Sequence, residues 1–366
     1  MEIAYDHQIF GWQRYGGVSR YFYELANNIS QNMMCNVSIV SPLYVNSYLV
    51  TAPSDLRVLG LKMPAIRRTG RIYRAFNQLL ASPIMHGLQP DVVHETYYSK
   101  NRQAPKNSKV VLTVFDMIHE RFPESFSKWD PLASEKATAV KRADHIVCIS
   151  EHTRQDLIQL LDVKQEKISV VHLGFSLTVD NKAGESLVKR PYLLYVGGRA
   201  GYKNFDALLR AYASLPALAR DFDLVAFGGG ALHPKERALI GALGLSDSQV
   251  RQIGGGDSIL SGLYQGASLF VYPSLYEGFG IPPLEAMSFD CPVVCSNTSS
   301  IPEVVGDAAI FFDPMSINSI AKAMEAVVSN ESIRERLIAR GRERIKLFSW
   351  QRCARQTLEV YGKLVA

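Results

Sequence analysis

The sequence predicts an α/β protein of two doubly wound domains, each a parallel sheet with helices on both faces. Three observations support this. The chain has 366 residues, short apolar runs alternate with helical patterns, and a polar stretch interrupts that alternation near the middle. A chain of this length exceeds what one hydrophobic core usually supports, so two domains are expected. Alternation of strands with helices is typical of parallel sheets.

The strand candidates are short runs rich in β-branched and aromatic residues. They are Ile3–Asp6, Val37–Val40, Val92–His94, Val110–Phe115, His145–Ile149 and Ser169–His172 in the first half, and Tyr192–Val196, Asp223–Phe227, Leu269–Tyr272, Val293–Cys295 and Ile310–Phe312 in the second. Helical patterns lie between them, for example at Ser19–Ile29 and Thr153–Leu160. Ser150 is the expected N-cap of the latter helix.

The segment Gly174–Arg190 is polar and lacks periodicity, so it is the linker candidate. The predicted N-terminal domain spans residues 1–175 and the C-terminal domain residues 176–349, with a last helix at about 350–366 expected to pack back on the first domain. Ligands bind at the carboxyl ends of the strands in such sheets. Two domains facing each other would therefore place a site in the cleft between them.

The composition, 47% hydrophobic and 20% charged, is that of a soluble globular protein. No apolar run approaches the roughly 18–20 residues that span a bilayer. The start, Met1–Tyr5, is a strand pattern without the basic and apolar regions of a signal peptide. Five scattered cysteines favour a reducing compartment over a disulfide framework. A cytoplasmic location is expected.

The net charge of +5 is unevenly distributed. No acidic residue lies between Asp55 and Asp91, a span that carries Arg57, Lys62, Arg67, Arg68, Arg71 and Arg74. Arg67, Arg71 and Arg74 are spaced as on one face of a helix, at i, i+4 and i+7. Ile72, Phe76 and Leu79 form a neighbouring apolar row. Contact with an anionic membrane surface through residues about 57–80 is one interpretation. A solvated helix face over an ordinary core is the other. No nucleic-acid motif accompanies the patch.

The most informative segment is Glu277–Glu285, in which seven residues separate two glutamates. It follows the apolar run Ala267–Tyr272 and leads into a predicted helix start at Leu284. Gly278 and Gly280 let a backbone approach a ligand closely, and a helix N-terminus attracts anions. Two carboxylates beside such a turn predict a site for a ligand with both hydroxyls and phosphates.

Two further glycine turns follow strands. Gly197 and Gly198 precede Arg199, with Lys203 four residues later, and two such cations can offset the charge of a diphosphate without a metal. Gly16 and Gly17 precede a helix start, a second phosphate-binding candidate. No G-x-G-x-x-G follows the first strand, which disfavours a nicotinamide dehydrogenase. No cluster has metal-ligand spacing.

Asp116 and His119 follow the strand candidate Val110–Phe115. They are the acid, base or orienting candidates of the first half.

The stretch Tyr272–Pro314 (YPSLYEGFGIPPLEAMSFDCPVVCSNTSSIPEVVGDAAIFFDP) resembles glycosyltransferase family 4, retaining enzymes of the GT-B fold. Glu277 and Glu285 match the family's E-x7-E motif. Tyr195–Asn204 resembles its phosphate loop, and Val147–Leu157 its linker helix. The N-terminal Tyr5–Phe10 and Gly16–Tyr21 look like bacterial members that build O-antigen or other surface polysaccharide.

This resemblance implies that the N-terminal domain is the acceptor side and that the C-terminal domain binds the nucleotide sugar. It also implies roles for the donor-binding residues. Glu285 would hold the ribose hydroxyls and Glu277 the hydroxyls of the donor sugar, beside a developing oxocarbenium ion. Main-chain N–H groups at Phe279 and Gly280 would face the sugar or diphosphate, and Gly278 would belong to the same donor-binding turn. The remaining contacts to the donor would come from Arg199 and Lys203 on the phosphates and from the loop of Gly16 and Gly17. Relatives carry a histidine where this chain has Phe115-Asp116, so Asp116 and His119 both stay candidates for its role.

The expected activity is transfer of a hexose with retention, most simply mannose from GDP-mannose, to a lipid-linked glycan acceptor. No metal and no cofactor beyond the nucleotide-sugar co-substrate is expected, and the cytoplasmic membrane's inner face is the expected place of action. Two alternatives stay open. One is a GT-B sugar-nucleotide epimerase or hydrolase, and the other a noncatalytic nucleotide-sugar-binding scaffold at the membrane.

Overall fold

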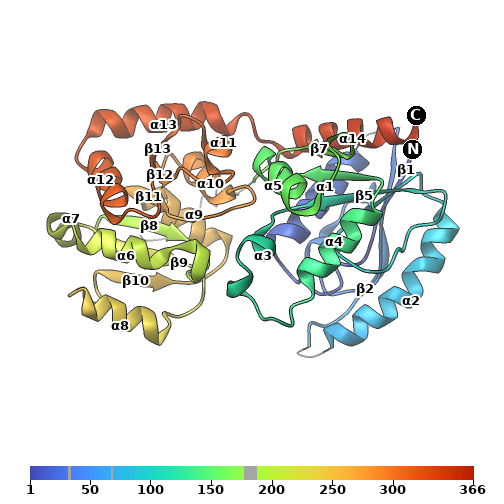
Figure 1. Ribbon diagram of the computed structural model, residues 1–366, viewed down its shortest axis with the longest axis horizontal. Helices are drawn as coiled ribbons and strands as arrows, with labels where there is room; N and C mark the ends of the chain where they lie inside the picture. Colours follow the sequence, from blue (N-terminus) through green and yellow to red (C-terminus); the bar gives the residue numbers. More distant parts are fainter. Residues whose placement is uncertain (32–33, 67–68, 177–187) are drawn as a thin grey trace. The chain divides into compact units, whose positions relative to one another are not determined.

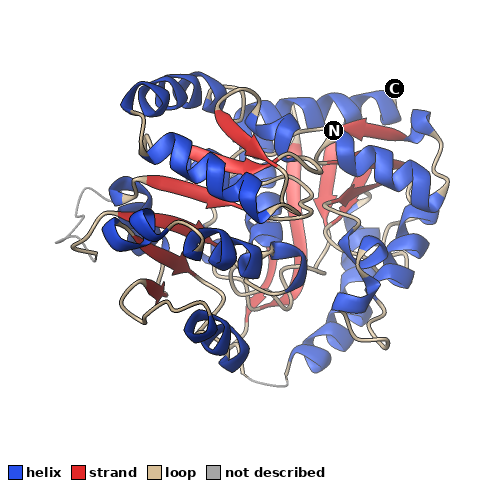
Figure 2. Cartoon of the chain, turned by 60° about the vertical axis from the view of Figure 1, so that its left-hand side comes forward, coloured by secondary structure: helices blue, strands red, loops and turns tan. Residues whose placement is uncertain are grey.

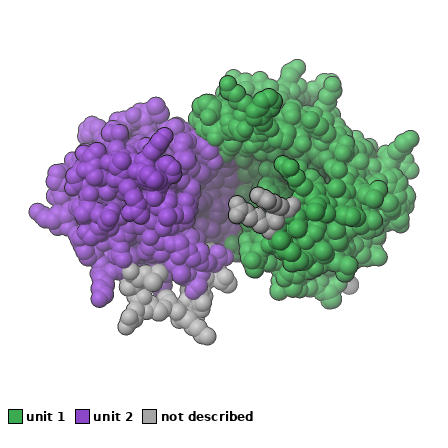
Figure 3. Space-filling model, turned by 90° about the horizontal axis from the view of Figure 1, so that it is seen from below, with its two compact units in different colours: residues 1–174, 349–366 green, residues 175–348 purple. Residues whose placement is uncertain are grey.

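The computed structural model describes residues 1–31, 34–66, 69–176 and 188–366. The chain forms two compact units, coloured separately in Figure 3. Unit 1 contains residues 1–174 and 349–366, and unit 2 contains residues 175–348. Most of the linker candidate lies outside the described residues.

Unit 1 combines a parallel sheet with helices from residues 1–174 and with the last helix of the chain (Figure 1). Its strands are β1 (Glu2–Tyr5), β2 (Asn36–Tyr44), β3 (Arg57–Lys62), β4 (Val92–Glu95), β5 (Lys109–Val114), β6 (His145–Cys148) and β7 (Ile168–Val170). Its α-helices are α1 (Gly17–Ser30), α2 (Gly70–Leu88), α3 (Ile118–Arg121), α4 (Leu132–Arg142), α5 (Glu151–Leu161) and α14 (Trp350–Val365).

Unit 2 repeats this organisation. Its strands are β8 (Tyr192–Val196), β9 (Asp223–Phe227), β10 (Val250–Ile253), β11 (Leu269–Tyr272), β12 (Val293–Ser296) and β13 (Ala309–Phe312). Its α-helices are α6 (Phe205–Ala213), α7 (Pro216–Asp221), α8 (Pro234–Ala242), α9 (Asp257–Gly266), α10 (Ile281–Ser288), α11 (Ile301–Val305), α12 (Ile317–Val328) and α13 (Glu331–Ile345).

Both sheets are parallel among the described strands. The order in unit 1 is β3-β2-β1-β4-β5-β6-β7, and in unit 2 it is β10-β9-β8-β11-β12-β13. In each sheet the order reverses beside the first strand, between β1 and β4 and between β8 and β11. This reversal is the topological switch point at which doubly wound folds bind ligands.

Helices cover both faces of each sheet (Figure 2). In unit 1, α2, α4 and α5 contribute buried side chains to the core on one face, whereas α1 packs with α14 on the other. In unit 2, α6, α7, α8 and α12 pack on one face, and α9 and α10 on the other. Strands covered on both faces carry continuous apolar runs, which is why the central strands were recognisable in the sequence.

Helix α14 closes one face of unit 1 with a buried hydrogen-bonded cluster. The hydroxyl of Tyr361 lies 3.2 Å from that of Tyr5 and 2.5 Å from Nδ1 of His94. His94 Nε2 lies 2.8 Å from the Thr113 hydroxyl. Burial lowers the pKa of His94 to about 3, so the imidazole is neutral. His94 therefore joins α14 to the sheet.

Two strands, β3 and β10, were not predicted, whereas the others coincide with the predicted runs to within a few residues. β3 and β10 stand first in their sheets, with a single strand neighbour. Several of their side chains are exposed or half-buried and polar, so neither strand shows the apolar run of a central strand. The N-cap prediction is confirmed, because Ser150 accepts a hydrogen bond from the N–H of Thr153.

The acid-free basic segment forms β3 and the first half of α2, while Arg67 and Arg68 lie outside the described residues. In α2, every fourth residue from Tyr73 to Met85 is buried. The predicted apolar row of Ile72, Phe76 and Leu79 is half or more exposed instead. These side chains leave an apolar surface beside Arg71 and Arg74. No helix of the described residues is both long and apolar enough to cross a bilayer.

Candidate functional site

The Glu277–Glu285 segment joins β11 to α10. Gly280 has a φ of 107°, which only glycine adopts without strain, and it forms the N-cap of α10. The helix begins at Ile281, three residues before the predicted start, because Pro282 and Pro283 fit its first turn. Since prolines lack an N–H, Ile281 supplies the only N–H donor among the first three positions of α10.

Two adjacent serines hold the turn that carries Glu277. The hydroxyl of Ser299 accepts from the N–H of Glu277 at 3.0 Å. The buried hydroxyl of Ser300 lies 2.8 Å from the carbonyl oxygens of both Glu277 and Phe279. Neither serine was among the predicted site residues. Their position as two adjacent hydroxyl residues just before the short helix α11 is the sequence feature that could have indicated this role.

Lys203 and Glu277 are brought together as an ion pair, with Nζ and Oε1 separated by 2.7 Å. Lys203 follows β8 and Glu277 follows β11, and these two strands are neighbours in the sheet. Both are mostly buried. A paired lysine and glutamate at this strand end can bind phosphate oxygens and sugar hydroxyls respectively.

Glu285 is the fifth residue of α10 and lies just beyond its first turn. Its Oε2 accepts from the hydroxyl of Tyr264 at 3.1 Å. Burial, and then the neighbouring carboxylate of Glu285, raise the pKa of Tyr264 well above its ordinary value, so this hydroxyl stays a donor. Tyr264 thus fixes one oxygen of Glu285.

The guanidinium of Arg199 is buried and engaged by protein groups. It pairs with Glu236 at 2.9 Å and donates to the carbonyl oxygens of Gly228, Gly230 and Ala231 at 2.6–3.0 Å. In this structure Arg199 therefore orders the glycine loop after β9. Phosphate binding by Arg199 stays a prediction, and Lys203 is the better placed cation beside Glu277.

Gly16 and Gly17 start α1 as predicted, in unit 1. The side chain of Gln13 accepts from the N–H of Ser19 at 2.9 Å and so occupies one donor of this helix end. A Cβ on Gly17 would meet no atom within 4 Å, which leaves its surroundings open. The predicted donor contact of these glycines stays a prediction.

Asp116 and His119 lie in unit 1, before and within α3. Oδ1 of Asp116 accepts from the N–H of Ile118 at 3.0 Å, and fully buried Lys136 donates to the Asp116 carbonyl at 2.8 Å. His119 stacks on Phe126, and its Nε2 lies 3.6 Å from a carboxylate oxygen of Asp130. A catalytic role for Asp116 or His119 stays a prediction. Lys136 was missed, because a lysine in a helical pattern usually indicates a solvated face.

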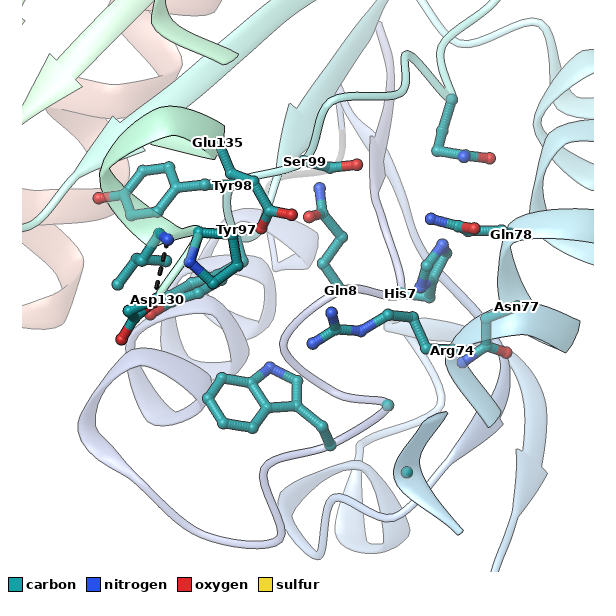
Figure 4. Close-up of a pocket in the computed structure, with 16 residues that line it drawn as sticks. His7, Gln8, Arg74, Asn77, Gln78, Tyr97, Tyr98, Ser99, Asp130 and Glu135 are labelled. Atoms are coloured by element: carbon teal, nitrogen blue, oxygen red, sulfur yellow. Dashed lines mark hydrogen bonds between the residues drawn. The ribbon is translucent and has the colours of Figure 1, made fainter. Parts of the chain in front are cut away.

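A pocket of about 360 Å³ lies in unit 1, and Figure 4 shows its lining. His7 and Gln8 reach it from the loop after β1, and Tyr97 and Tyr98 from the loop after β4. Arg74 points into it from α2. No residue of this pocket was among the predicted site residues.

Metal binding has no evident location in the described part of the chain. No three histidine, cysteine, aspartate or glutamate side chains are grouped there as a metal site requires. The expectation of a metal-free reaction stays a prediction.

Two family models match the chain. One described as Glycosyltransferase Family 4 matches residues 15–179, and one described as Glycosyl transferases group 1 matches residues 179–344. Among curated proteins, O-antigen chain mannosyltransferase B of Escherichia coli is 33% identical over 282 residues, which cover 73% of this chain and 74% of that protein. Serotype-specific mannosyltransferase WbdA of Escherichia coli is 31% identical over 244 residues, 63% of this chain but only 30% of WbdA.

Solved structures share the fold over the whole chain. Sucrose-phosphate synthase from Thermosynechococcus elongatus superposes with a TM-score of 0.77 at 19% identity, covering 99% of this chain and 98% of that one. WaaG, a glycosyltransferase involved in lipopolysaccharide biosynthesis, gives a TM-score of 0.71 at 17% identity, covering 98% and 99%. At such identities the similarity concerns the fold alone.

Proposed function

Because the chain belongs to glycosyltransferase family 4 and has the GT-B fold of two parallel-sheet α/β domains, we propose that it transfers mannose from GDP-mannose, with retention, to a lipid-linked glycan. The family and fold predictions are thereby confirmed. The proposed donor and pathway, surface polysaccharide of the O-antigen type, rest on the similarity to O-antigen chain mannosyltransferase B.

The observation that carries this proposal is the Lys203–Glu277 pair beside the start of α10. Lys203 offsets negative charge on the leaving diphosphate. Glu277 accepts from hydroxyls of the donor sugar and places a carboxylate near the positive charge that develops on its ring. Glu285, held by Tyr264, accepts from the ribose hydroxyls. The acceptor hydroxyl attacks the anomeric carbon on the face from which the diphosphate leaves, so that the C–O bond to phosphate breaks and the new glycosidic bond retains the configuration. The departing phosphate takes the proton of the attacking hydroxyl, and no metal takes part.

A donor screen tests this proposal directly. GDP-mannose should raise the melting temperature of the protein, with a stabilisation of about 2.7 kcal/mol at a hundred times its dissociation constant. UDP- and dTDP-sugars should raise it far less. Transfer to a lipid-linked mannosyl acceptor should persist in EDTA, and proton NMR should show a product with the anomeric configuration of the donor.

Three results would contradict the proposal. Consumption of UDP- or dTDP-sugars with no binding of GDP-mannose would reject the donor. Turnover of GDP-mannose without an acceptor would favour a hydrolase or epimerase. Binding without any turnover would favour a noncatalytic scaffold.

We further propose that α2 holds unit 1 at the inner face of the cytoplasmic membrane. Its exposed Ile72, Phe76 and Leu79 can enter the interface between lipid headgroups and acyl chains. Arg71 would contact anionic headgroups, and Arg74, which points into the unit 1 pocket, would add positive charge beside it. No acidic residue of the neighbouring sequence opposes them.

Reversing the charge of Arg71 and Arg74 to glutamate should weaken binding to phosphatidylglycerol-containing liposomes by about 30-fold or more, since each basic residue contributes about 1 kcal/mol near an anionic surface. The matched control reverses Arg352 and Arg355, an exposed pair at the same spacing on α14. Sedimentation with liposomes at two salt concentrations measures the effect. Equal loss in both variants would reject docking through α2.

A further inference from the structure

We propose that Lys136 is a positioning residue for sugar transfer, whose buried ammonium holds the loop after β5 so that the Asp116 carboxylate is presented to the acceptor. This rests on the proposed function, because it names a residue that acts on the acceptor end of the same transfer.

Lys136 is a charged residue in a place where apolar residues are usual. It lies in the middle of α4, and its side chain is 0% exposed. Lysine is among the residues least often fully buried, because an ammonium loses its hydration there. A buried ion pair generally adds little stability compared with apolar side chains of the same volume. The burial of Lys136 therefore indicates a role other than stability.

The ammonium of Lys136 contacts both ends of one short segment, Asp116–Glu120. It donates to the main-chain carbonyl of Asp116 and to Oε2 of Glu120, each at 2.8 Å. Oδ1 of Asp116 lies 3.9 Å from the same nitrogen. Since one cation on α4 binds both ends, the segment is fixed to this helix.

Tyr98 holds the same segment from the loop after β4. Its hydroxyl accepts from the N–H of Phe115 at 3.3 Å. Its ring centroid lies 5.5 Å from the Lys136 ammonium, within the range of a cation–π contact. Tyr98 also lines the unit 1 pocket, beside Tyr97 (Figure 4). Lys136 and Tyr98 therefore connect the loop after β5 to a wall of this pocket.

The Asp116 carboxylate is the group that this arrangement leaves accessible. Its Oδ1 accepts from the N–H of Ile118 at 3.0 Å, which fixes the orientation of the side chain. The Asp116 side chain is 32% exposed, against 12% for Glu120. Burial, and then the charge of Asp116, raise the pKa of Tyr97 to about 12, so this carboxylate lies near the pocket wall. Because a carboxylate accepts from hydroxyls, Asp116 can orient a glycan.

Lys136 stands between two carboxylates that would otherwise repel each other. Asp116 and Glu120 both have an oxygen within 4 Å of its ammonium, at 3.9 and 2.8 Å. Among the described residues the buried Oε1 of Glu120 has no hydrogen-bond partner, so Lys136 is the main support of this carboxylate. Without the cation the segment should shift and displace Asp116. A misplacement of about 1 Å can cost roughly 100-fold in rate.

Variants of the full chain test this role. Lys136→Met alone leaves Glu120 as a buried unpaired charge and should lower the melting temperature. Lys136→Met combined with Glu120→Gln removes the ion pair at similar volume, so this double variant should fold about as stably as the wild type. Its kcat for transfer to the lipid-linked mannosyl acceptor should fall roughly 10- to 100-fold, while KM for the nucleotide sugar stays the same. The control is Lys141→Met, which removes an exposed lysine from the same helix and should leave both constants unchanged.

A mutant cycle with Asp116→Asn shows whether Lys136 acts through Asp116. Asp116→Asn should lower kcat of the wild type to a similar degree and have little further effect when added to Lys136→Met/Glu120→Gln. Losses that multiply would overturn the inference, because Lys136 would then act independently of Asp116. Wild-type kcat in the double variant or in Asp116→Asn would overturn it as well.

Hydrogen exchange of residues 115–122 needs no donor, so this inference can fail separately from the proposed function. Peptides of this segment should lose protection in Lys136→Met/Glu120→Gln, while those of β2 and α1 keep theirs. Unchanged protection of residues 115–122 overturns the inference whichever sugar is transferred. If the wild type consumes a UDP- or dTDP-sugar instead of GDP-mannose, the proposed donor is rejected, and kcat and KM are measured with that sugar.

Discussion

The variants Glu277→Gln and Lys203→Met are each expected to lose at least about 100-fold in kcat/KM for sugar transfer. Fixed charges aimed at charge that develops in the transition state are worth about 10²–10³ in rate. Glu277 and Lys203 are mostly buried and face each other at 2.7 Å. Removing one also leaves the other as an uncompensated charge, which is costly away from water.

The double variant distinguishes a catalytic pair from two independent residues. Because the two side chains act on each other, the double loss should be smaller than the product of the single losses. The control is the pair Glu343 and Lys346, separated by 2.6 Å but well exposed, whose replacement by glutamine and methionine should leave transfer unchanged. Full turnover by either single variant at Glu277 or Lys203, with unchanged melting temperature, would remove these residues from the mechanism.

Deletion of residues 349–366 is expected to prevent stable folding of unit 1. Helix α14 buries Trp350, Val360 and Tyr361 against this unit. Each contributes about 1.5–3 kcal/mol by burial, and a domain has only about 5–15 kcal/mol of net stability. The deletion also leaves the buried polar atoms of Tyr5 and His94 without the Tyr361 hydroxyl.

Hydrogen exchange measured by mass spectrometry reports the effect of the deletion on each unit separately. Peptides of β1, β4 and α1 should lose protection in the deletion variant, while those of β8, β9 and α6 should keep theirs. Tyr361→Phe is the milder comparison, since it keeps the ring and removes only the hydroxyl, and it should cost about 1–3 kcal/mol. Native protection of β1 and β4 without α14 would show that the helix is dispensable for this unit.

The sequence predicted most readily the strands that are buried on both faces of the sheet. Central strands such as β8 and β11 are buried on both faces, so their apolar runs were visible, whereas the edge strands β3 and β10 mix polar and apolar residues and were missed. The helix at Glu285 was predicted to begin three residues late, because its first turn contains two prolines that look like a loop.

The candidate site likewise has one part that could be predicted from the sequence and another that could not. Glu277 and Glu285 lie in one contiguous segment whose glycines, prolines and carboxylates suffice to indicate a ligand site. The unit 1 pocket combines residues from the loops after β1 and β4, from α2 and from the start of α4. These segments are far apart in the chain, so no single stretch of sequence could have indicated the pocket.

The parallel α/β fold, the glycosyltransferase family and the segment that carries the paired glutamates could be inferred from the sequence, because they depend on local periodicity and on residues close together in the chain. The partners of the charged groups became evident from the three-dimensional structure. Lys203 meets Glu277 because β8 and β11 are neighbours in the sheet. Arg199 is held by Glu236 and the glycine loop because β9 flanks β8 on its other side. The order of strands in a sheet depends on packing between distant segments, which no short stretch of sequence contains.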